Sequence, residues 1–338
     1  MYQQPFHTNN ISNNTFLVTG GAGFIGSNIV EYLIKYNAGK VRVLDNFSTG
    51  TIDNLRDFLS LPNFELIRGD IRDAEVCCLA AKDIQYVLHQ AALGSVPRSI
   101  NDPITSNDVN VGGFVNMLVA AKNAGVRRMV YAASSSTYGD HPALPKTEDN
   151  IGNPLSPYAV TKLVNELYAG VFSRVYNFHT IGLRYFNVFG PKQSPNGPYV
   201  AVIPLFIEAA LSGKSPYIYG DGETSRDFTF IENVVQANIR ALFTENLMQH
   251  EVLNIAYGER TTLNELWQHI AQFTGCSNTP VYNEARMGDV KHSLADISKA
   301  EHLIGYKPEI SVLDGLQATI VWYADAIKER NKETATSD

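Results

Sequence analysis

The chain has 338 residues, of which 44% are hydrophobic and 18% charged, as in an ordinary globular protein with enough apolar residues for a sizeable core. A formal net charge of −7 disfavours nucleic acid as a partner, because a nucleic-acid site needs a basic face. No apolar run approaches the ~18 residues of a membrane span, and the polar opening MYQQPFHTNNISNN is unlike a signal peptide, so we expect a cytoplasmic protein with no membrane partner. The three cysteines form neither a disulfide framework nor a zinc pattern, and no metal is expected.

Short apolar segments alternate with helical stretches through the first half of the chain. Helices are expected at 25–36 and 109–124 among others, and strands at 15–20, 40–45, 64–70, 85–91, 128–134 and 179–186. This alternation predicts an α/β fold with a doubly wound, Rossmann-like parallel sheet covered by helices on both faces. A late segment, 252–256, is expected at the edge of the sheet.

The segment VTGGAGFIGSNIV follows the first predicted strand and opens a helix. Gly20, Gly23 and Gly26 have the spacing that gives a tight turn, close approach of a pyrophosphate and close helix–strand packing. Asp45 ends the second strand, where an acceptor for a ribose hydroxyl is expected. A carboxylate there repels a 2′-phosphate, so the sequence predicts a dinucleotide site that prefers NAD to NADP.

The serine-rich segment SSSTYGD, residues 134–140, follows the fifth predicted strand. Serines favour polar loops, so a plain surface loop is one interpretation. Open α/β sheets bind their ligands outside the carboxyl ends of the strands, however. We therefore expect the serines to face the cofactor crevice.

The segment NPLSPYAVTK contains a tyrosine and a lysine four residues apart. Ser156 suits a helix N-cap and Pro157 the first helical position, so a helix should begin just before Tyr158. We expect Tyr158 and Lys162 to share a face roughly opposite the main core contact. That contact is predicted to be the apolar set Val160, Leu163, Val164, Leu167 and Val171. Taken alone, the pair also fits an amphipathic helix with a solvated tyrosine and lysine.

From about residue 187 the chain becomes rich in proline, glycine and turns, with scattered helices. The length also favours more than one domain. We therefore expect a smaller, mixed α/β domain on the carboxyl side of the sheet. The predicted division is 14–186 plus about 235–262 for the NAD-binding domain, and 187–234 plus about 263–330 for the second domain.

Together the glycine turn, the serine run, the Tyr-x-x-x-Lys pair and LRYFNVFGP (183–191) resemble the extended short-chain dehydrogenase/reductases, and within them the nucleotide-sugar 4-epimerases. The resemblance covers residues 14 to 325 and implies that the second domain binds a nucleotide sugar. It implies that Ser134 orients the sugar hydroxyl, Tyr158 is the base, and Lys162 holds the nicotinamide ribose and lowers the pKa of Tyr158. Lowering that pKa from ~10 to neutrality requires roughly 4 kcal/mol. One ammonium group ~4 Å away supplies about that much at an effective dielectric constant of about 20.

The resemblance also implies which residues contact NAD. They cluster in the glycine turn and after the second, third, fourth and sixth strands. The set is Gly20, Gly23, Phe24, Ile25, Gly26, Asp45, Asn46, Ser48, Thr49, Gly50, Asp70, Ile71, Gln90, Ala91, Ala92, Tyr158, Lys162 and Tyr185.

A second set is expected to contact a UDP-sugar substrate. Arg226 and Arg286 match contacts to the diphosphate and ribose, where a planar fork can grip phosphate oxygens. Ser135 and Ser136 stand where the family's dehydratases carry an Asp-Glu pair, which argues against dehydration. The full set is Gly94, Ser95, Ser135, Ser136, Asn187, Val202, Tyr217, Arg226, Arg286, Asp289 and Ser293.

Ser293 bears on the choice of sugar. Relatives confined to plain glucose and galactose carry a tyrosine at the matching place, whereas serine leaves room for an N-acetyl group. The prediction is reversible, NAD-dependent epimerisation at carbon 4 of UDP-N-acetylglucosamine and UDP-N-acetylgalactosamine. The alternatives are a UDP-glucose 4-epimerase, a decarboxylase or reductase of nucleotide sugars, and a non-catalytic NAD-sensing regulator. The family also implies a homodimer formed through residues 100–124 and 155–175.

Overall fold

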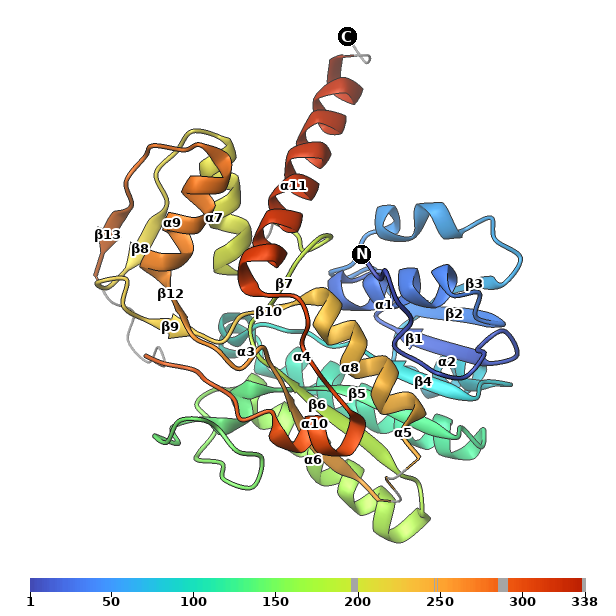
Figure 1. The fold of residues 1–338 in the computed structure, drawn as a ribbon. Helices are drawn as coiled ribbons and strands as arrows, with labels where there is room; N and C mark the ends of the chain where they lie inside the picture. Colours follow the sequence, from blue (N-terminus) through green and yellow to red (C-terminus); the bar gives the residue numbers. More distant parts are fainter. Residues whose placement is uncertain (196–199, 246, 248, 285–290, 336–338) are drawn as a thin grey trace.

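The computed structural model describes residues 1–195, 200–245, 247, 249–284 and 291–335, and is built around a parallel sheet (Figure 1). Within these residues, seven parallel strands pair in the order β11-β6-β5-β4-β1-β2-β3. They are β1 (Thr15–Thr19), β2 (Lys40–Asp45), β3 (Phe64–Arg68), β4 (Tyr86–His89), β5 (Arg128–Ser134), β6 (Thr180–Tyr185) and β11 (Glu251–Ile255). The predicted α/β class and the edge position of 252–256 are confirmed.

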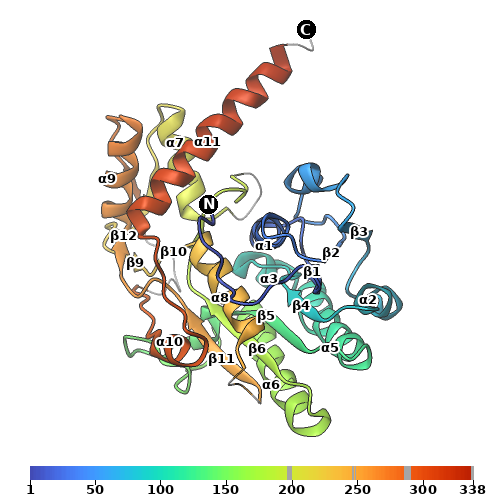
Figure 2. The ribbon, with the colours of Figure 1, turned by 45° about the vertical axis from the view of Figure 1, so that its right-hand side comes forward.

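Helices cover both faces of this sheet. Contacts join α1 to α8 on one face and link α2, α5 and α6 on the other, and each face has its own apolar core (Figures 1 and 2). A π-helical turn, Asp108–Gly113, joins α4 to α5 within the predicted helix 109–124. The helices are α1 (Phe24–Lys35), α2 (Ala74–Ala81), α3 (Val96–Asn101), α4 (Pro103–Asn107), α5 (Phe114–Asn123), α6 (Pro157–Tyr176) and α8 (Ile231–Phe243).

The order of the strands reverses at β1, which pairs with β2 on one side and with β4 on the other. In an open α/β sheet, ligands bind outside the carboxyl ends of the strands at such a switch point. The glycine turn leaves β1 here, with Gly20 in the left-handed region (φ +67°) and its N–H donating to the Leu44 carbonyl at 2.8 Å. The topology thus places the predicted dinucleotide site at the switch point.

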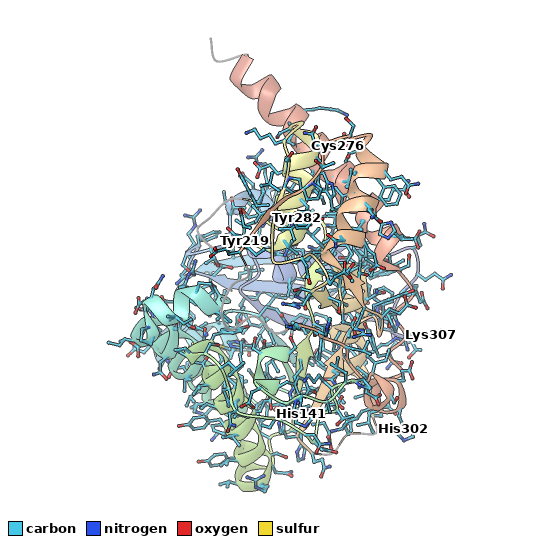
Figure 3. All side chains as sticks on the ribbon, turned by 90° about the vertical axis from the view of Figure 1, so that its left-hand side faces the viewer. His141, Tyr219, Cys276, Tyr282, His302 and Lys307 are labelled. Carbon is cyan, nitrogen blue, oxygen red and sulfur yellow. The ribbon has the colours of Figure 1, made fainter. Side chains whose placement is uncertain are left out.

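The rest of the chain packs beside the carboxyl ends of the strands as helices and two-stranded ribbons (Figure 1). The ribbons pair β7 (Val188–Phe189) with β10 (Thr229–Phe230), β8 (Tyr217–Tyr219) with β13 (Val281–Asn283), and β9 (Ser225–Arg226) with β12 (Thr261–Thr262). Figure 3 shows this side, with Tyr219 and Tyr282 on the β8–β13 ribbon. The helices are α7 (Val202–Leu211), α9 (Leu263–Thr274), α10 (Ser298–Ile304) and α11 (Val312–Ala335). Among the described residues, no helix has both the length and the apolar character needed to cross a membrane.

Helix α6 begins where the sequence predicts, but its predicted buried face is wrong. The Ser156 hydroxyl accepts the N–H of Ala159 at 3.1 Å, and Pro157 opens the helix. Three of the five apolar side chains expected in the core lie on the surface instead, with Val160 48%, Leu167 61% and Val171 41% exposed, and the other two are only partly buried. Lys162, expected on the opposite face, is only 3% exposed.

The buried face of α6 is polar because the sheet provides partners for it. The Lys162 ammonium donates to the Ala132 carbonyl of β5 at 2.7 Å, and Glu166 accepts two hydrogen bonds from Arg184 of β6 at 2.9 and 2.7 Å. A buried polar group that is hydrogen-bonded escapes most of the cost of leaving water. Helical spacing alone cannot reveal such partners, because they come from distant strands.

Candidate functional site

The glycine turn is packed so closely that larger residues are excluded. A Cβ at Gly26 would stand 2.1 Å from the Gly20 carbonyl oxygen, and one at Gly20 would stand 2.7 Å from the Ala91 nitrogen. Helix α1 starts at Phe24 without a side-chain cap. The free amide groups and partial positive charge of a helix N-terminus favour an anion such as a pyrophosphate.

A cavity of about 430 Å³ opens beside this turn and contains most of the predicted cofactor set. Gly94 and Ser95 of the predicted substrate set also line it. From the cofactor set it is lined by Gly20, Gly23, Phe24, Ile25, Gly26, Asp45, Asn46, Ser48, Thr49, Asp70, Ile71, Gln90, Ala91 and Ala92. Gly50 borders a neighbouring hollow instead, packed against the backbone of Ala22.

Sequence reasoning missed part of the wall of this cavity. Gln193, Ser194, Val200 and Ala201 close it from the turn-rich segment that precedes α7, and Arg98 reaches it from α3. The remaining lining residues that were not predicted are Leu44, Gly69, Leu93 and Val109. A signal for Arg98 was present, because it lies in the first turn of α3, three residues after the N-cap Ser95. The segment around 193 gave only a turn signal, which does not tell where a loop folds.

Asp45 keeps its carboxylate beside the glycine turn. One oxygen accepts the N–H of Ala22 at 2.9 Å and the other accepts the N–H of Phe47 at 2.8 Å. Burial raises the pKa of Asp45, and the two backbone N–H groups oppose that rise. Because a carboxylate has about four acceptor positions, each oxygen keeps one for a ribose hydroxyl.

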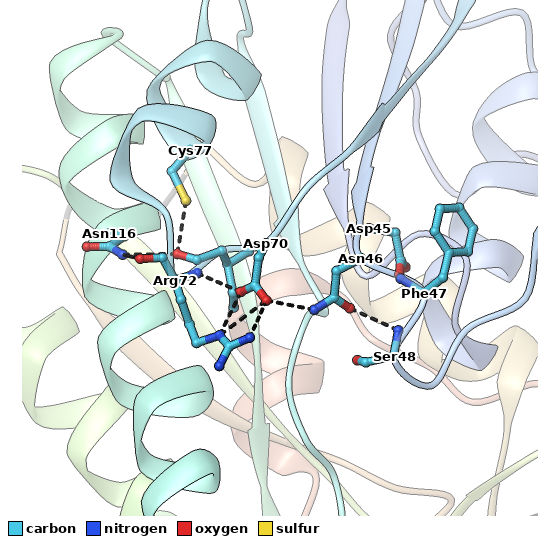
Figure 4. Close-up of polar contacts among 9 residues, drawn as sticks. Asp45, Asn46, Phe47, Ser48, Asp70, Arg72, Cys77 and Asn116 are labelled. Atoms are coloured by element: carbon cyan, nitrogen blue, oxygen red, sulfur yellow. Dashed lines mark hydrogen bonds and ion pairs between the residues drawn. The ribbon is translucent and has the colours of Figure 1, made fainter.

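Asp70 is held ionised at the next strand end, as Figure 4 shows. Hydrogen bonds from Arg72, the shortest at 2.7 Å, lower the pKa of Asp70 to about 2 despite partial burial. Asn46 also donates to Asp70 at 2.9 Å, and its own side-chain oxygen accepts the N–H of Ser48 at 3.0 Å. The adenosine end of the cavity is therefore lined by fixed acceptors.

These residues fit a dinucleotide. The glycines leave space where any Cβ would collide with backbone, the helix start favours the pyrophosphate, and Asp45 offers acceptors for ribose hydroxyls while repelling a 2′-phosphate. If NAD is bound here, the glycine turn would hold its phosphates and Asp45 its adenosine ribose.

Tyr158 and Lys162 lie together on the sheet-facing side of α6. The Lys162 ammonium is 5.9 Å from the centre of the Tyr158 ring, and Ser134 hydrogen-bonds with the tyrosine. None of the three residues Ser134, Tyr158 and Lys162 lines the cavity directly. Tyr185 also lies just outside the lining and is connected to it, because its hydroxyl donates to Gln90 at 3.2 Å.

We expect from the sequence that Lys162 lowers the pKa of Tyr158, but in this structure the pKa of Tyr158 is raised. Burial raises the pKa of Tyr158, and the hydrogen bond with Ser134 only partly opposes that rise. Burial also lowers the pKa of Lys162 to about 8, against the attraction of Glu166. Both side chains have lost hydration, and the lysine donates to the Ala132 carbonyl instead of the phenol.

The remaining substrate candidates are only partly brought together. Ser135 and Ser136 follow β5, Asn187 follows β6, Val202 begins α7, and Tyr217, 64% exposed, lies on β8. Arg226 and Ser293 are neighbours, because the Ser225 carbonyl accepts both the Arg226 guanidinium at 3.0 Å and the Ser293 N–H at 3.1 Å. Arg286 and Asp289 lie outside the described residues.

A doubly wound sheet, a glycine turn at the switch point and an adjacent Tyr–Lys pair define a dinucleotide-dependent enzyme fold. The family model described as the NAD dependent epimerase/dehydratase family matches residues 16–256, which is most of the chain. The protein belongs to this family, and its cofactor is NAD.

Individual relatives align over nearly their whole length. The UDP-N-acetylglucosamine 4-epimerase of Methanobrevibacter ruminantium M1, solved with UDP-N-acetylmuramic acid, is 40% identical with a TM-score of 0.88, covering 93% of this chain and 99% of that one. The UDP-glucose 4-epimerase of Thermotoga maritima, solved with UDP-glucose, is 35% identical with a TM-score of 0.87 and the same coverage. The UDP-glucose 4-epimerase of Mycolicibacterium smegmatis is 37% identical over 309 residues, 91% of this chain and 97% of that protein. The predicted resemblance to nucleotide-sugar 4-epimerases is confirmed.

Proposed function

We propose that the protein is a UDP-sugar 4-epimerase that interconverts UDP-N-acetylglucosamine and UDP-N-acetylgalactosamine with NAD as its cofactor. The observation that carries the reaction type is the partly buried Tyr158 beside the buried Lys162, with Ser134 hydrogen-bonded to the tyrosine, next to the cavity of the glycine turn. These groups supply a phenol, an ammonium and a hydroxyl at one place, as reversible proton transfer from a sugar hydroxyl requires.

When bound, NAD would supply reversible hydride transfer at carbon 4 of the sugar, with its phosphates held by the glycine turn and its adenosine ribose by Asp45. Tyr158 takes the proton of the carbon-4 hydroxyl as that carbon is oxidised to a ketone, and returns it when the ketone is reduced. Ser134 holds the same sugar oxygen. Lys162, already fixed by Ala132, keeps a positive charge 5.9 Å from the centre of the Tyr158 ring. Residues 14–186 and about 235–262 hold NAD, and the remaining part of 187–330 holds the nucleotide sugar.

The choice of sugar rests on Ser293. Its backbone is fixed to β9 next to Arg226, the candidate contact to the substrate diphosphate, and this supports a position for Ser293 near the substrate. A tyrosine here would fill space that an N-acetyl group needs. The two solved relatives are named for different sugars. Their identities to this chain, 40% and 35%, are too similar for overall identity to choose between the sugars.

The test uses purified protein and UDP-N-acetylglucosamine with no added dinucleotide, followed by NMR and mass analysis. An epimerase gives the galacto isomer with unchanged mass, whereas a decarboxylase needs an acid substrate. Ser293→Tyr should abolish turnover of acetylated sugars and spare UDP-glucose, so acetylated turnover at the wild-type level would contradict the sugar assignment.

Tyr158→Phe should lower kcat by about 100-fold or more. A non-catalytic NAD sensor would be indifferent to that change.

A homodimer is part of the proposal, and the surface of α4 and α6 supports it. Ile104, Leu167 and Val171 are 74%, 61% and 41% exposed on helices within the two predicted interface segments. Apolar side chains gathered in this way usually mark an interaction surface. A second copy of the chain, bringing the same surface, would cover them symmetrically.

A further inference from the structure

The side chain of Asn254, at the end of the edge strand β11, joins two walls of the proposed sugar site. It is fully buried. Its oxygen accepts the hydroxyl of Tyr138 at 2.6 Å, and its nitrogen donates to the carbonyls of Lys146 at 2.9 Å and Asp296 at 3.0 Å. Both amide hydrogens and the amide oxygen are therefore used.

The first wall is the turn that carries the candidate catalytic serine. Tyr138 ends the 3₁₀ turn Ser135–Tyr138, which directly follows Ser134. The Ser134 hydroxyl accepts the N–H of Ser136 at 3.1 Å, so the turn fixes that hydroxyl. The centre of the Tyr138 ring lies 4.8 Å from the guanidinium carbon of Arg184. The hydroxyl of Tyr138 extends beyond the ring and connects the turn to Asn254.

The second wall is the segment from Ser293 to Asp296. Its first residue is hydrogen-bonded to β9, as described above. The carbonyl of Leu294 accepts the N–H of Lys146 at 2.8 Å, and Asp227 accepts the N–H of Ala295 at 3.1 Å. Asn254 completes the attachment through the Asp296 carbonyl. The segment that contains Ser293 is therefore fixed to the main sheet by its far end.

We propose that Asn254 is a positioning residue that fixes the Ser293–Asp296 segment relative to the turn of Ser134, and so links sugar selectivity to the catalytic geometry. The inference rests on the proposed function for the roles of Ser134 and Ser293. An asparagine is needed because only an amide of this size offers one acceptor to the phenol and two donors to the two carbonyls.

The two sides of this bridge can be cut separately. Asn254→Asp keeps an acceptor for Tyr138 but removes both donors, so the Ser293–Asp296 segment keeps its backbone bonds and loses its side-chain attachment at Asp296. Tyr138→Phe removes the hydroxyl and leaves both bonds to the carbonyls, so it releases the serine turn. Asn233→Asp is the matched control: Asn233 is equally buried and joins the backbone of Glu309 and Ile310 by similar bonds, away from both walls.

The variants are purified with their bound NAD, checked for folding by thermal melting and NAD content, and assayed with UDP-N-acetylglucosamine and UDP-glucose. Tyr138→Phe should lower kcat about ten-fold on both sugars and leave their selectivity ratio unchanged, because misplacement by a fraction of an ångström is costly in catalysis. Asn254→Asp should lower the ratio of kcat/KM for acetylated over plain sugar by about ten-fold. Asn233→Asp should change neither quantity, although it also weakens the fold.

The proposal is overturned if both folded variants keep the wild-type kcat and selectivity ratio, or if Asn233→Asp changes these quantities as much as they do. If Asn254→Asp does not accumulate as folded protein, Tyr138→Phe decides alone, and an unchanged kcat refutes the positioning role. If the wild-type enzyme turns over only UDP-glucose, the proposed sugar assignment fails. The positioning role is then decided by kcat of Tyr138→Phe and KM of Asn254→Asp on that substrate.

Discussion

Replacing Lys162 with methionine should make the protein more stable while it destroys activity. Lys162 is 3% exposed, and the hydrogen bond from its ammonium to the Ala132 carbonyl does not recover the hydration that the charge has lost. Burial consequently lowers the pKa of Lys162 to about 8. A methionine of similar length carries no charge, so the folded state no longer bears this cost.

The magnitude follows from the difference between that pKa and the ordinary lysine value of about 10.4. At ~1.36 kcal/mol per pH unit, the charged lysine costs the folded state about 3 kcal/mol at pH 7. Loss of the hydrogen bond to Ala132 takes back about 1 kcal/mol, so Lys162→Met should gain about 2 kcal/mol. Between pH 8 and 10.5 the unfolded chain binds more protons than the folded one, so the wild type gains stability with rising pH. The advantage of the variant should be near zero by about pH 10.

The assay is urea unfolding of both proteins at pH 7, 8.5 and 10, at equal concentration and after removal of bound dinucleotide. Lys82→Met is the control for loss of a lysine charge, because the side chain of Lys82 is exposed. A Lys162→Met variant that is less stable than the wild type at pH 7, or whose advantage does not change with pH, would refute the reasoning. Either result would mean that Lys162 is stabilised by its surroundings instead of strained by them.

Two further predictions concern α6. Leu167→Glu places a charge in the exposed apolar surface and should halve the mass measured by light scattering, since a dimer would have to bury two carboxylates; an unchanged dimer mass places the interface elsewhere. Glu166→Gln breaks a buried ion pair with Arg184 whose two side chains are 8% and 4% exposed, and should lower the free energy of unfolding by about 3–5 kcal/mol. Glu65→Gln removes the partly exposed ion pairs of Glu65 with Lys40 and Arg42 and should cost about 1 kcal/mol in the same urea titration, so equal losses would contradict the role of burial.

The parts of the fold that depend on local sequence could be predicted. The strands up to β6 and β11 were identified because each is a short apolar run bounded by turns, and their alternation with helices implies parallel order. The glycine turn was identified because its spacing has a steric cause, which the close approach of Gly26 to the Gly20 carbonyl shows directly. Ser156 and Pro157 marked the start of α6 for an equally local reason.

Features that depend on distant partners could not be predicted. The burial of Lys162 requires the Ala132 carbonyl, and that of Glu166 requires Arg184, from strands β5 and β6. The direction of the pKa shift at Tyr158 follows from burial, which no spacing reveals. Gln193 reaches the cavity wall only because its loop is held in place, with its carbonyl accepting the hydroxyl of Tyr323 from α11.

If the proposed function and the proposed dimer hold, the inverted arrangement of α6 connects catalysis to assembly. A helix that presents a tyrosine and a lysine to the cofactor must turn that side toward the sheet, so the charges of Lys162 and Glu166 are buried and the apolar side chains face outward. The buried lysine alone costs about 3 kcal/mol. Leu167 and Val171 are 61% and 41% exposed, so covering each contributes roughly half of the ~1.5–3 kcal/mol of full burial, and two to four such residues per chain offset that cost. On this reasoning, contacts made by the exposed apolar surface of α6 offset the cost of its polar buried face. A variant that cannot dimerise should therefore be less stable than the wild type even when Tyr158 and Lys162 are unchanged.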